Sequence, residues 1–367
     1  MHKQKIISYI QLINTAGIGP INFRHLIERY GDVDKALSEV SLKKKIFPRQ
    51  KAEEELMTAE LKHVQIITSE DECYPYNLKQ IEDFPPILYA LGNINLLKND
   101  NALAVVGSRS ASISANHLAE QISFELAGNN IVIVSGMARG IDTSAHKGAL
   151  SANGNTIAVL GTGIDVIYPK ENEEIYKKIA KTGLILTEYP FHTGPQATNF
   201  PRRNRIVSGL SKGVLVIEAG IQSGSLITAY QALEQGRDVY AIPGAPYDNR
   251  SLGCNKLLKE GAILVEASQD IIDNFNFTQV KFEPHKNNTV EIPDLFEYSL
   301  DKSKNNSDIA EQDKYSKLLS LISESGEDVD DVIRESNLPT EEVLMMIVEL
   351  ELENKIIRLP GNKIAKT

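Results

Sequence analysis

The architecture of this chain can be worked out from residues 200–229, which read FPRRNRIVSGLSKGVLVIEAGIQSGSLITA. Three arginines open the stretch, and a buried-looking strand at Val214–Ile217 follows them. After the strand, a glycine turn leads through Gly224-Ser225 into a helix that runs to about Gln235. A strand, a glycine turn and a helix start typify an anion site, because free backbone N–H groups and the helix dipole point at the turn. The arginines favour phosphate as the anion, whereas the alternative interpretation treats them as a solvated loop.

Strand-like and helix-like runs alternate on both sides of this stretch. Short apolar strands that alternate with helices predict an α/β fold with a doubly wound, mostly parallel sheet. Such sheets bind ligands at the carboxyl ends of their strands. The expected strands are 64–68, 87–90, 102–106, 131–134, 156–160, 184–187, 214–217, 238–242 and 262–265, and the expected helices are 115–126, 141–151, 171–181, 225–235 and 252–259.

Four glycine turns follow strands of the expected sheet, and they are its most informative feature. They lie at 107–110, 135–140, 161–163 and 218–225. None has the G-x-G-x-x-G spacing with an acidic ribose partner that a nicotinamide site requires. Two of them carry an arginine, Arg109 and Arg139, where a dinucleotide turn keeps small residues. Gathered at one edge, these turns predict an anion site, and Lys170 and Lys212 either add charge at its rim or are solvated.

The sequence offers no recognisable catalytic group. It has no G-x-S-x-G elbow and no carboxylate pair at the local spacing of a glycosidase or a metal site. His146 falls inside a helix and is expected to pack, while Asp142 is expected to cap the same helix. Glu218, at a strand end, is the best candidate for an acid or base if one exists. We therefore expect a protein that is not an enzyme and has no metal or cofactor.

Composition limits the class of protein. A chain of 367 residues with 42% hydrophobic residues exceeds one domain and can build a sizeable core. Its two cysteines, Cys73 and Cys254, lack metal-like spacing and are typical of a reducing cytoplasm. We expect no signal peptide and no membrane span, because no apolar run is long enough. The net charge of -10 argues against nucleic-acid binding by the whole surface, but it leaves room for a local basic groove.

Several ordered motifs resemble those of the DNA-processing protein DprA (Smf) family. They are Gly107-Ser108-Arg109, SGMARGID at 135–142, FPRRNRI at 200–206 and EAGIQSGSLITA at 218–229. The resemblance is dense from residue 63 to about 270. It implies an extended Rossmann-like domain that binds single-stranded DNA without sequence preference. It also implies a homodimer that loads the recombinase RecA on incoming DNA during natural transformation.

The resemblance also indicates which residues contact DNA. The family's DNA-binding positions fall on its GSR turn and its FPxRNR segment, and we add the neighbouring glycine turns and lysines. Phe200, Tyr168 and Phe191 are the nearest aromatic candidates for stacking on bases. The expected DNA-binding residues are Gly107, Ser108, Arg109, Ser135, Gly136, Arg139, Lys170, Arg202, Arg203, Asn204, Arg205, Lys212, Gly224 and Ser225.

An alternative is a nucleotide-processing hydrolase on a related Rossmann-like fold, such as the LOG-type phosphoribohydrolases. Those enzymes carry a PGGxGTxxE turn where this chain reads EAGIQSGS at 218–225. The missing motif and the added FPRRNR run favour the non-catalytic interpretation.

The flanks of the α/β domain, 61–280, predict three further parts. Residues 1–60 are expected to be helical, with a Gly17–Pro20 turn that resembles a helix-hairpin-helix, a motif that can bind phosphate. Because acidic residues surround this turn, we favour a helical packing module that binds nothing. Residues 281–311 read as a flexible linker. Residues 312–367 predict three helices and a hairpin, which is a winged helix. Its many carboxylates favour a protein-binding or regulatory role over DNA reading.

Overall fold

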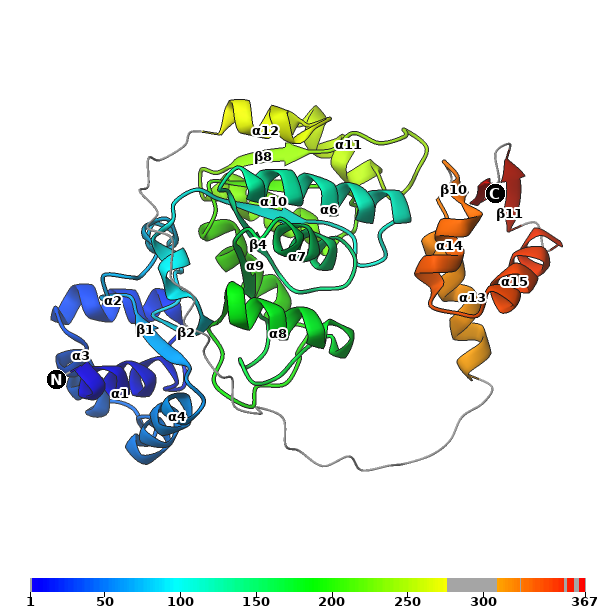
Figure 1. Ribbon diagram of the computed structural model, residues 1–367. Coiled ribbons are helices and arrows are strands. Elements are labelled where there is room, and N and C mark those ends of the chain that lie inside the picture. Colours follow the sequence, from blue (N-terminus) through cyan, green and yellow to red (C-terminus); the bar gives the residue numbers. More distant parts are fainter. Residues whose placement is uncertain (1, 276–308, 324, 353–354, 360–362, 367) are drawn as a thin grey trace.

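The structure, a computed structural model, describes residues 2–275, 309–323, 325–352, 355–359 and 363–366 (Figure 1). Most of the predicted linker lies outside these residues. The main body is built on a nine-stranded sheet with the order β1-β2-β6-β5-β4-β3-β7-β8-β9. The first two strands pair antiparallel, and so do β2 and β6, while the pairs from β6 to β9 are parallel. The strands are β1 (Gln65–Thr68), β2 (Ile87–Gly92), β3 (Ala102–Val106), β4 (Val132–Ser135), β5 (Thr156–Val159), β6 (Leu184–Thr187), β7 (Gly213–Val216), β8 (Asp238–Ala241) and β9 (Ile263–Leu264).

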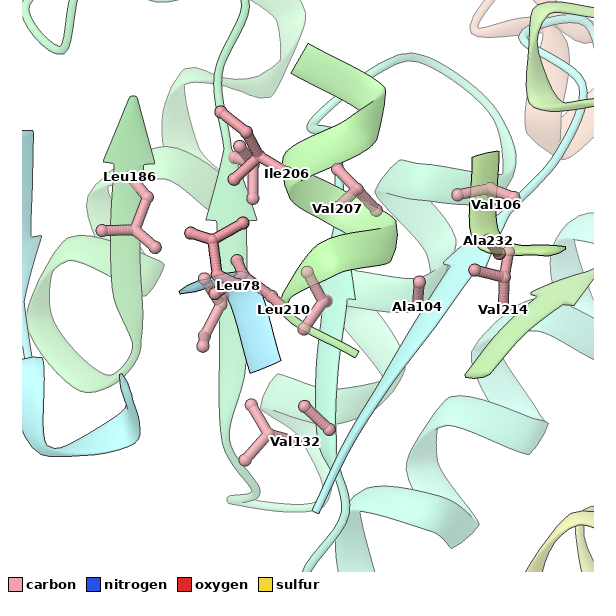
Figure 2. Packing of buried hydrophobic residues seen from close by; sticks show 14 of the residues in the cluster. Leu78, Ala104, Val106, Val132, Leu186, Ile206, Val207, Leu210, Val214 and Ala232 are labelled. Carbon is pink, nitrogen blue, oxygen red and sulfur yellow. The ribbon is translucent and has the colours of Figure 1, made fainter. Parts of the chain in front are cut away.

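Helices cover both faces of the sheet, which confirms the predicted doubly wound α/β class. Strand β3 is buried along its whole length, and its side chains alternate between two apolar clusters. Ala104 and Val106 point to the cluster that includes α9, as Figure 2 shows, while Leu103 and Val105 point to the cluster under α6 and α7. This alternation is the two-residue period of a strand that is covered on both sides. The helices of this body are α5 (Tyr76–Lys79), α6 (Ile113–Gly128), α7 (Ile141–Ser151), α8 (Glu173–Thr182), α9 (Asn199–Gly209), α10 (Gly224–Glu234), α11 (Leu252–Lys259) and α12 (Ser268–Asn274), with 3-10 turns η1 (Ile94–Lys98) and η2 (Lys170–Asn172).

Helix α9 is the main element that the sequence analysis did not predict. Its FPRRNR residues form the first turns of a helix rather than a loop. Proline at residue 201 suits a first turn, where a missing N–H costs nothing. Further along, Ile206, Val207 and Leu210 are buried against the sheet (Figure 2). Only two turns of apolar spacing are present, so the helical period is too short to stand out from the basic run.

The N-terminal helices share their core with the sheet. They are α1 (His2–Ile13), α2 (Pro20–Tyr30), α3 (Val33–Ser41) and α4 (Arg49–Leu61). Tyr9 and Phe23 lie with their ring centres 5.1 Å apart in an apolar cluster that also contains Ile66, Tyr89 and Ile185. The helices therefore cover the β1–β2–β6 edge of the sheet, and this part is not a separately cored unit.

The C-terminal domain has the expected helices and hairpin. Its helices are α13 (Ile309–Leu321), α14 (Val329–Ser336) and α15 (Thr340–Leu352), and β10 (Glu327–Asp328), β11 (Ile356–Leu359) and β12 (Lys363–Lys366) form a sheet in the order β10-β12-β11. The domain starts slightly earlier than expected, because α13 begins at Ile309. It touches the α/β domain at the start of α6, where Ile113 joins its apolar cluster and Ser114 Oγ donates to Glu327 Oε1 at 3.3 Å.

The described residues contain neither a membrane-spanning helix nor a metal-binding cluster. None of their helices has the length and apolar character that crossing a bilayer requires. Nor do they contain a group of three or more His, Cys, Asp or Glu side chains placed to hold a metal ion.

Candidate functional site

A cavity of about 640 Å³ opens at the carboxyl ends of the parallel strands, where a doubly wound sheet binds its ligands. The turns after β3 and β4 form one wall, and the N-terminal turns of α9 and α10 form the other. Of the residues predicted to bind DNA, those that line the cavity are Gly107, Arg109, Gly136, Arg203, Asn204, Gly224 and Ser225. The remaining lining residues are Val106, Ala138, Asp142, Tyr168, Pro195, Ala197, Phe200, Pro201, Val207, Ser223, Ile227 and Thr228.

The first wall depends on two glycines that let the β3 and β4 turns touch. A side chain at Gly107 would come within 2.5 Å of Ile141 Cγ1. Gly140 has φ of +70°, and a side chain there would collide with the carbonyl oxygen of Ser108. The Ser108 N–H donates to the carbonyl of Glu218 at 2.7 Å, which holds the β3 turn against the end of β7. Two separate turns thereby become one rigid wall.

Arg203 forms the floor of the cavity. It is 3% exposed, and its Nη1 donates to the carbonyl of Val159 at 2.5 Å. Its guanidinium fills the space where a side chain at Gly136 would stand. Burial lowers the pKa of Arg203 to about 10, while the nearby Asp142 carboxylate opposes that shift. At pH 7 the floor therefore stays positively charged, and Nε has no hydrogen-bond partner within the described chain.

Asp142 balances this charge from the turn after β4. Its carboxylate accepts from the N–H groups of Gly136 at 3.1 Å and Ala138 at 3.3 Å. Burial raises its pKa, and Arg203 and these N–H groups oppose the shift. Asp142 thus holds the turn before α7, close to its expected capping role. Among the lining residues of the described chain it is the sole carboxylate.

Arg109 provides an exposed cation at the mouth of the cavity. Its guanidinium carbon lies 5.2 Å from the ring centre of Phe200, and the rings of Phe200 and Tyr168 lie 5.6 Å apart. It forms no ion pair with any residue that the structure describes. The N-terminus of α10, capped by Ser223, faces the same space. An unpaired arginine, two aromatic rings and a helix N-terminus can bind a phosphate with an attached flat ring system.

Arg205, a predicted DNA-binding residue, does not line the cavity and is held by two carboxylates instead. Its Nη2 pairs with Glu188 at 2.5 Å and its Nε with Asp83 at 3.1 Å. The exposed fractions of the Arg205 and Glu188 side chains are only 8% and 13%. Arg203 and Arg205 are two residues apart in a helix, so their side chains point about 200° apart, and only one can face the cavity.

Lys212 does not belong to the rim either, because it precedes β7. It therefore lies at the amino ends of the parallel strands, whereas the cavity lies at their carboxyl ends. Its Nζ donates to Asn101 Oδ1 at 3.1 Å and lies 5.5 Å from the ring centre of Phe275. Burial lowers its pKa. Its position next to the strand in sequence does not show that it precedes the strand at the end opposite the cavity.

The other predicted contacts lie outside the cavity lining. Ser135 is buried and its Oγ donates to the carbonyl of Val105 at 2.7 Å. Arg139 is exposed and pairs with Glu171 at 2.5 Å. Exposed Lys170 and Arg202, and half-buried Ser108, are next or close in sequence to lining residues. Their contact with DNA stays a prediction.

The possible acid–base groups are engaged elsewhere. His146 is fully buried in α7, its Nδ1 lies 2.7 Å from Thr156 Oγ1, and burial lowers its pKa to about 3. Glu218 accepts from the backbone N–H and the hydroxyl of Ser112, so it holds the start of α6. Burial raises the Glu218 pKa. Neither group lines the cavity.

Comparisons with known proteins give a consistent result over almost the whole chain. The family model of DNA recombination-mediator protein A matches residues 65–276, that of the DprA winged helix domain matches 302–362, and that of the DprA-like N-terminal HHH domain matches 3–59. DNA processing protein DprA of Streptococcus pneumoniae is 49% identical over 56% of this chain and 73% of its own. Protein Smf of Escherichia coli is 38% identical over 86% of this chain and 81% of its own.

Solved structures agree with the sequence comparisons. The X-ray structure of DprA from Streptococcus pneumoniae superimposes with a TM-score of 0.65 at 38% identity, covering 74% of this chain and 99% of that one. DNA processing protein A from Helicobacter pylori, whose structure was described for its single-stranded DNA binding mode, gives a TM-score of 0.53 at 33% identity. That match covers 58% of this chain and 96% of the other.

The Arg205 ion pair generates a stability prediction. Arg205→Ala leaves the Glu188 carboxylate buried without its partner, so we expect the free energy of unfolding to fall by about 3–5 kcal/mol. Urea unfolding followed by circular dichroism measures this loss. Arg202→Ala, an exposed change on the same helix, should stay within about 0.5 kcal/mol of the wild type. Equal stability of the two variants would show that the Arg205 pair is not structural.

Proposed function

The chain belongs to the DNA-processing protein DprA (Smf) family, and from that premise we propose that its cavity binds single-stranded DNA without sequence preference. The observation that carries the proposal is the unpaired guanidinium of Arg109, held over the ring of Phe200 at the cavity mouth. A phosphate at this mouth meets a permanent cation and the N-terminus of α10, both of which favour negative charge. The glycine turns allow the backbone of the strand to approach the wall closely.

Arg203 contributes to binding from below. Its positive charge is buried and only partly balanced by Asp142. The Arg203 side chain therefore attracts an anion into the cavity while it stays buried in the floor. Asn204, which is half-buried, lies on the same turn of α9 and lines the cavity. Because Arg205 is paired with Glu188, the arginines that we propose to bind phosphate within the cavity are Arg109 and Arg203.

The preference for single strands follows from the aromatic side of the mouth. Tyr168 and Phe200 are tilted 38° to one another and line the cavity, so they offer ring surface to an unpaired base. Each base that stacks on an aromatic ring contributes about 1–3 kcal/mol, with little dependence on its identity. A duplex hides its base faces and cannot use this surface. Phe191, the third expected candidate, is buried against Tyr89 and is unsuited to stacking on a base.

We propose no chemical step at this site, against the alternative of a LOG-type hydrolase. Hydrolysis of a nucleoside monophosphate needs a group that activates water or protonates the base. Asp142, the lining carboxylate, is held by two backbone N–H groups beside Arg203, while His146 and Glu218 are engaged elsewhere.

We expect no release of free base from nucleoside monophosphates. Chromatography of reaction mixtures over hours measures it. Turnover above about 0.1 per second, against typical enzyme values near 10 per second, would favour the hydrolase alternative.

Family membership supports two further proposals, that the protein acts as a cytoplasmic homodimer and that it loads RecA on incoming single strands. Equilibrium sedimentation of the purified chain tests the dimer. For RecA, strands coated with a single-strand binding protein are mixed with RecA, and filament growth is followed by light scattering. We expect faster growth with this protein present, and indifference of the rate would count against loading.

The DNA site itself is tested through its salt dependence. Binding to a single strand releases counterions with a log–log slope near -0.7 per phosphate contacted. Arg109→Ala should flatten this slope by about 0.7–1, nearly equally for every base sequence, and leave the melting temperature unchanged. Fluorescence anisotropy with oligonucleotides across a salt series measures it.

The matched control is Arg49→Ala, an exposed change on α4 far from the cavity in sequence, which should leave the slope unaltered. Wild-type protein should also prefer the single strand over a duplex of equal length. Equal affinity for both forms, or an unaltered slope in Arg109→Ala, would place the DNA elsewhere.

A further inference from the structure

The N-terminal helical part contains a second cavity, of about 320 Å³. It lies between the turn that joins α1 to α2, the outer side of α2 and the end of α3. Its floor is apolar and includes buried Ile18 and Val40 and half-buried Leu26. A volume of this size is at the lower end of ligand pockets and accommodates one or two bulky side chains rather than an extended polymer.

The rim of this cavity is positively charged. Arg29, Lys43 and Lys44 are exposed, and none of them forms an ion pair with a described residue. The Arg29 guanidinium lies 5.4 Å from the ring centre of Tyr30, which orients it. Among the described residues that line this cavity, Glu39 is the one carboxylate, so the rim keeps a net positive charge in a chain whose net charge is -10. An apolar floor under a cationic rim matches a ligand with an apolar group and carboxylates.

The turn itself is poorly suited to a DNA phosphate, although it resembles a helix-hairpin-helix. Gripping a phosphate requires free backbone N–H groups, and one such group of this turn is engaged, because the Ile18 N–H donates to the carbonyl of Thr15 at 3.0 Å. The Asn22 side chain donates to the carbonyl of Gly17 at 3.1 Å and closes the turn on itself. Phosphates would meet the same cationic rim as carboxylates, but they would gain nothing from the apolar floor.

We propose that this cavity docks a short acidic peptide segment of a partner protein. One bulky apolar side chain of the peptide occupies the floor, and neighbouring carboxylates reach Arg29, Lys43 and Lys44. Charge complementarity at the exposed rim makes the association fast and salt-dependent, while the buried anchor supplies affinity. The site is independent of the DNA cavity, which lies at the carboxyl edge of the sheet.

A synthetic peptide tests the proposal with the full chain. The probe is a fluorescein-labelled peptide in which a Leu-Phe pair is flanked by glutamates. Two comparison peptides replace either the glutamates with glutamines or the Leu-Phe pair with alanines. We expect anisotropy to show binding of the first peptide and at least about tenfold weaker binding of both others, because each lacks one half of the complementarity.

Charge reversal locates the site. Lys43→Glu/Lys44→Glu should weaken binding of the acidic peptide by about tenfold or more. Lys35→Glu/Lys51→Glu, an equal charge change at exposed positions outside the lining, should leave it within about twofold. All four positions are exposed, so melting temperatures should match the wild type.

The proposal is overturned if the acidic peptide fails to bind, if its glutamine version binds equally, or if the two double variants behave alike. It is also overturned if Lys43→Glu/Lys44→Glu weakens oligonucleotide binding as much as Arg109→Ala does, because the cavity would then belong to the DNA site.

Discussion

The cavity depends on one buried contact, between the Arg203 guanidinium and the strand ends beneath it. The guanidinium donates to the carbonyl of Val159 and occupies the space left by Gly136, so helix α9 is fixed to the ends of β4 and β5. A buried cation survives only where polar groups surround it, and Asp142 and the carbonyl of Val159 provide them. The same contact therefore holds the wall in place and puts positive charge on the floor.

Helix α9 combines three tasks on three faces of one short element. Arg203 and Asn204 face the cavity, Arg205 binds Glu188, and Ile206 with Val207 packs into the core. Because these faces are rigidly related, a change in the packing of the core would move the floor of the cavity. The basic run at 202–205 thus supplies both a buried ion pair and part of the cavity lining, whereas its sequence alone resembles a uniform patch of charge.

The sheet and its glycine turns could be predicted from the sequence, because short apolar runs and the glycines that end them depend on local residues. The sequence could not show which arginine of the basic run faces the cavity, because this depends on the rotation of α9 about its axis. Arg203 and Arg205 are only two residues apart, yet the first lines the cavity and the second forms an ion pair. Lys212 was misplaced because the sequence analysis did not distinguish the two ends of β7. Two further contacts join residues that are far apart in the chain, namely Glu188 with Arg205 and Glu218 with Ser112. No local sequence pattern predicts such contacts.

The shared core of the N-terminal helices has a consequence for synthesis on the ribosome. Ile66 and Tyr89 complete their cluster only with Tyr176, Ile179 and Ile185, and β2 pairs with β6. Roughly 120 residues separate Ile66 from Ile185, which at ordinary translation rates is on the order of ten seconds. During that interval the N-terminal quarter of the protein, which is synthesised first, lacks strand β6, so its apolar side stays uncovered. A chain that pauses before β6 therefore leaves that apolar side exposed.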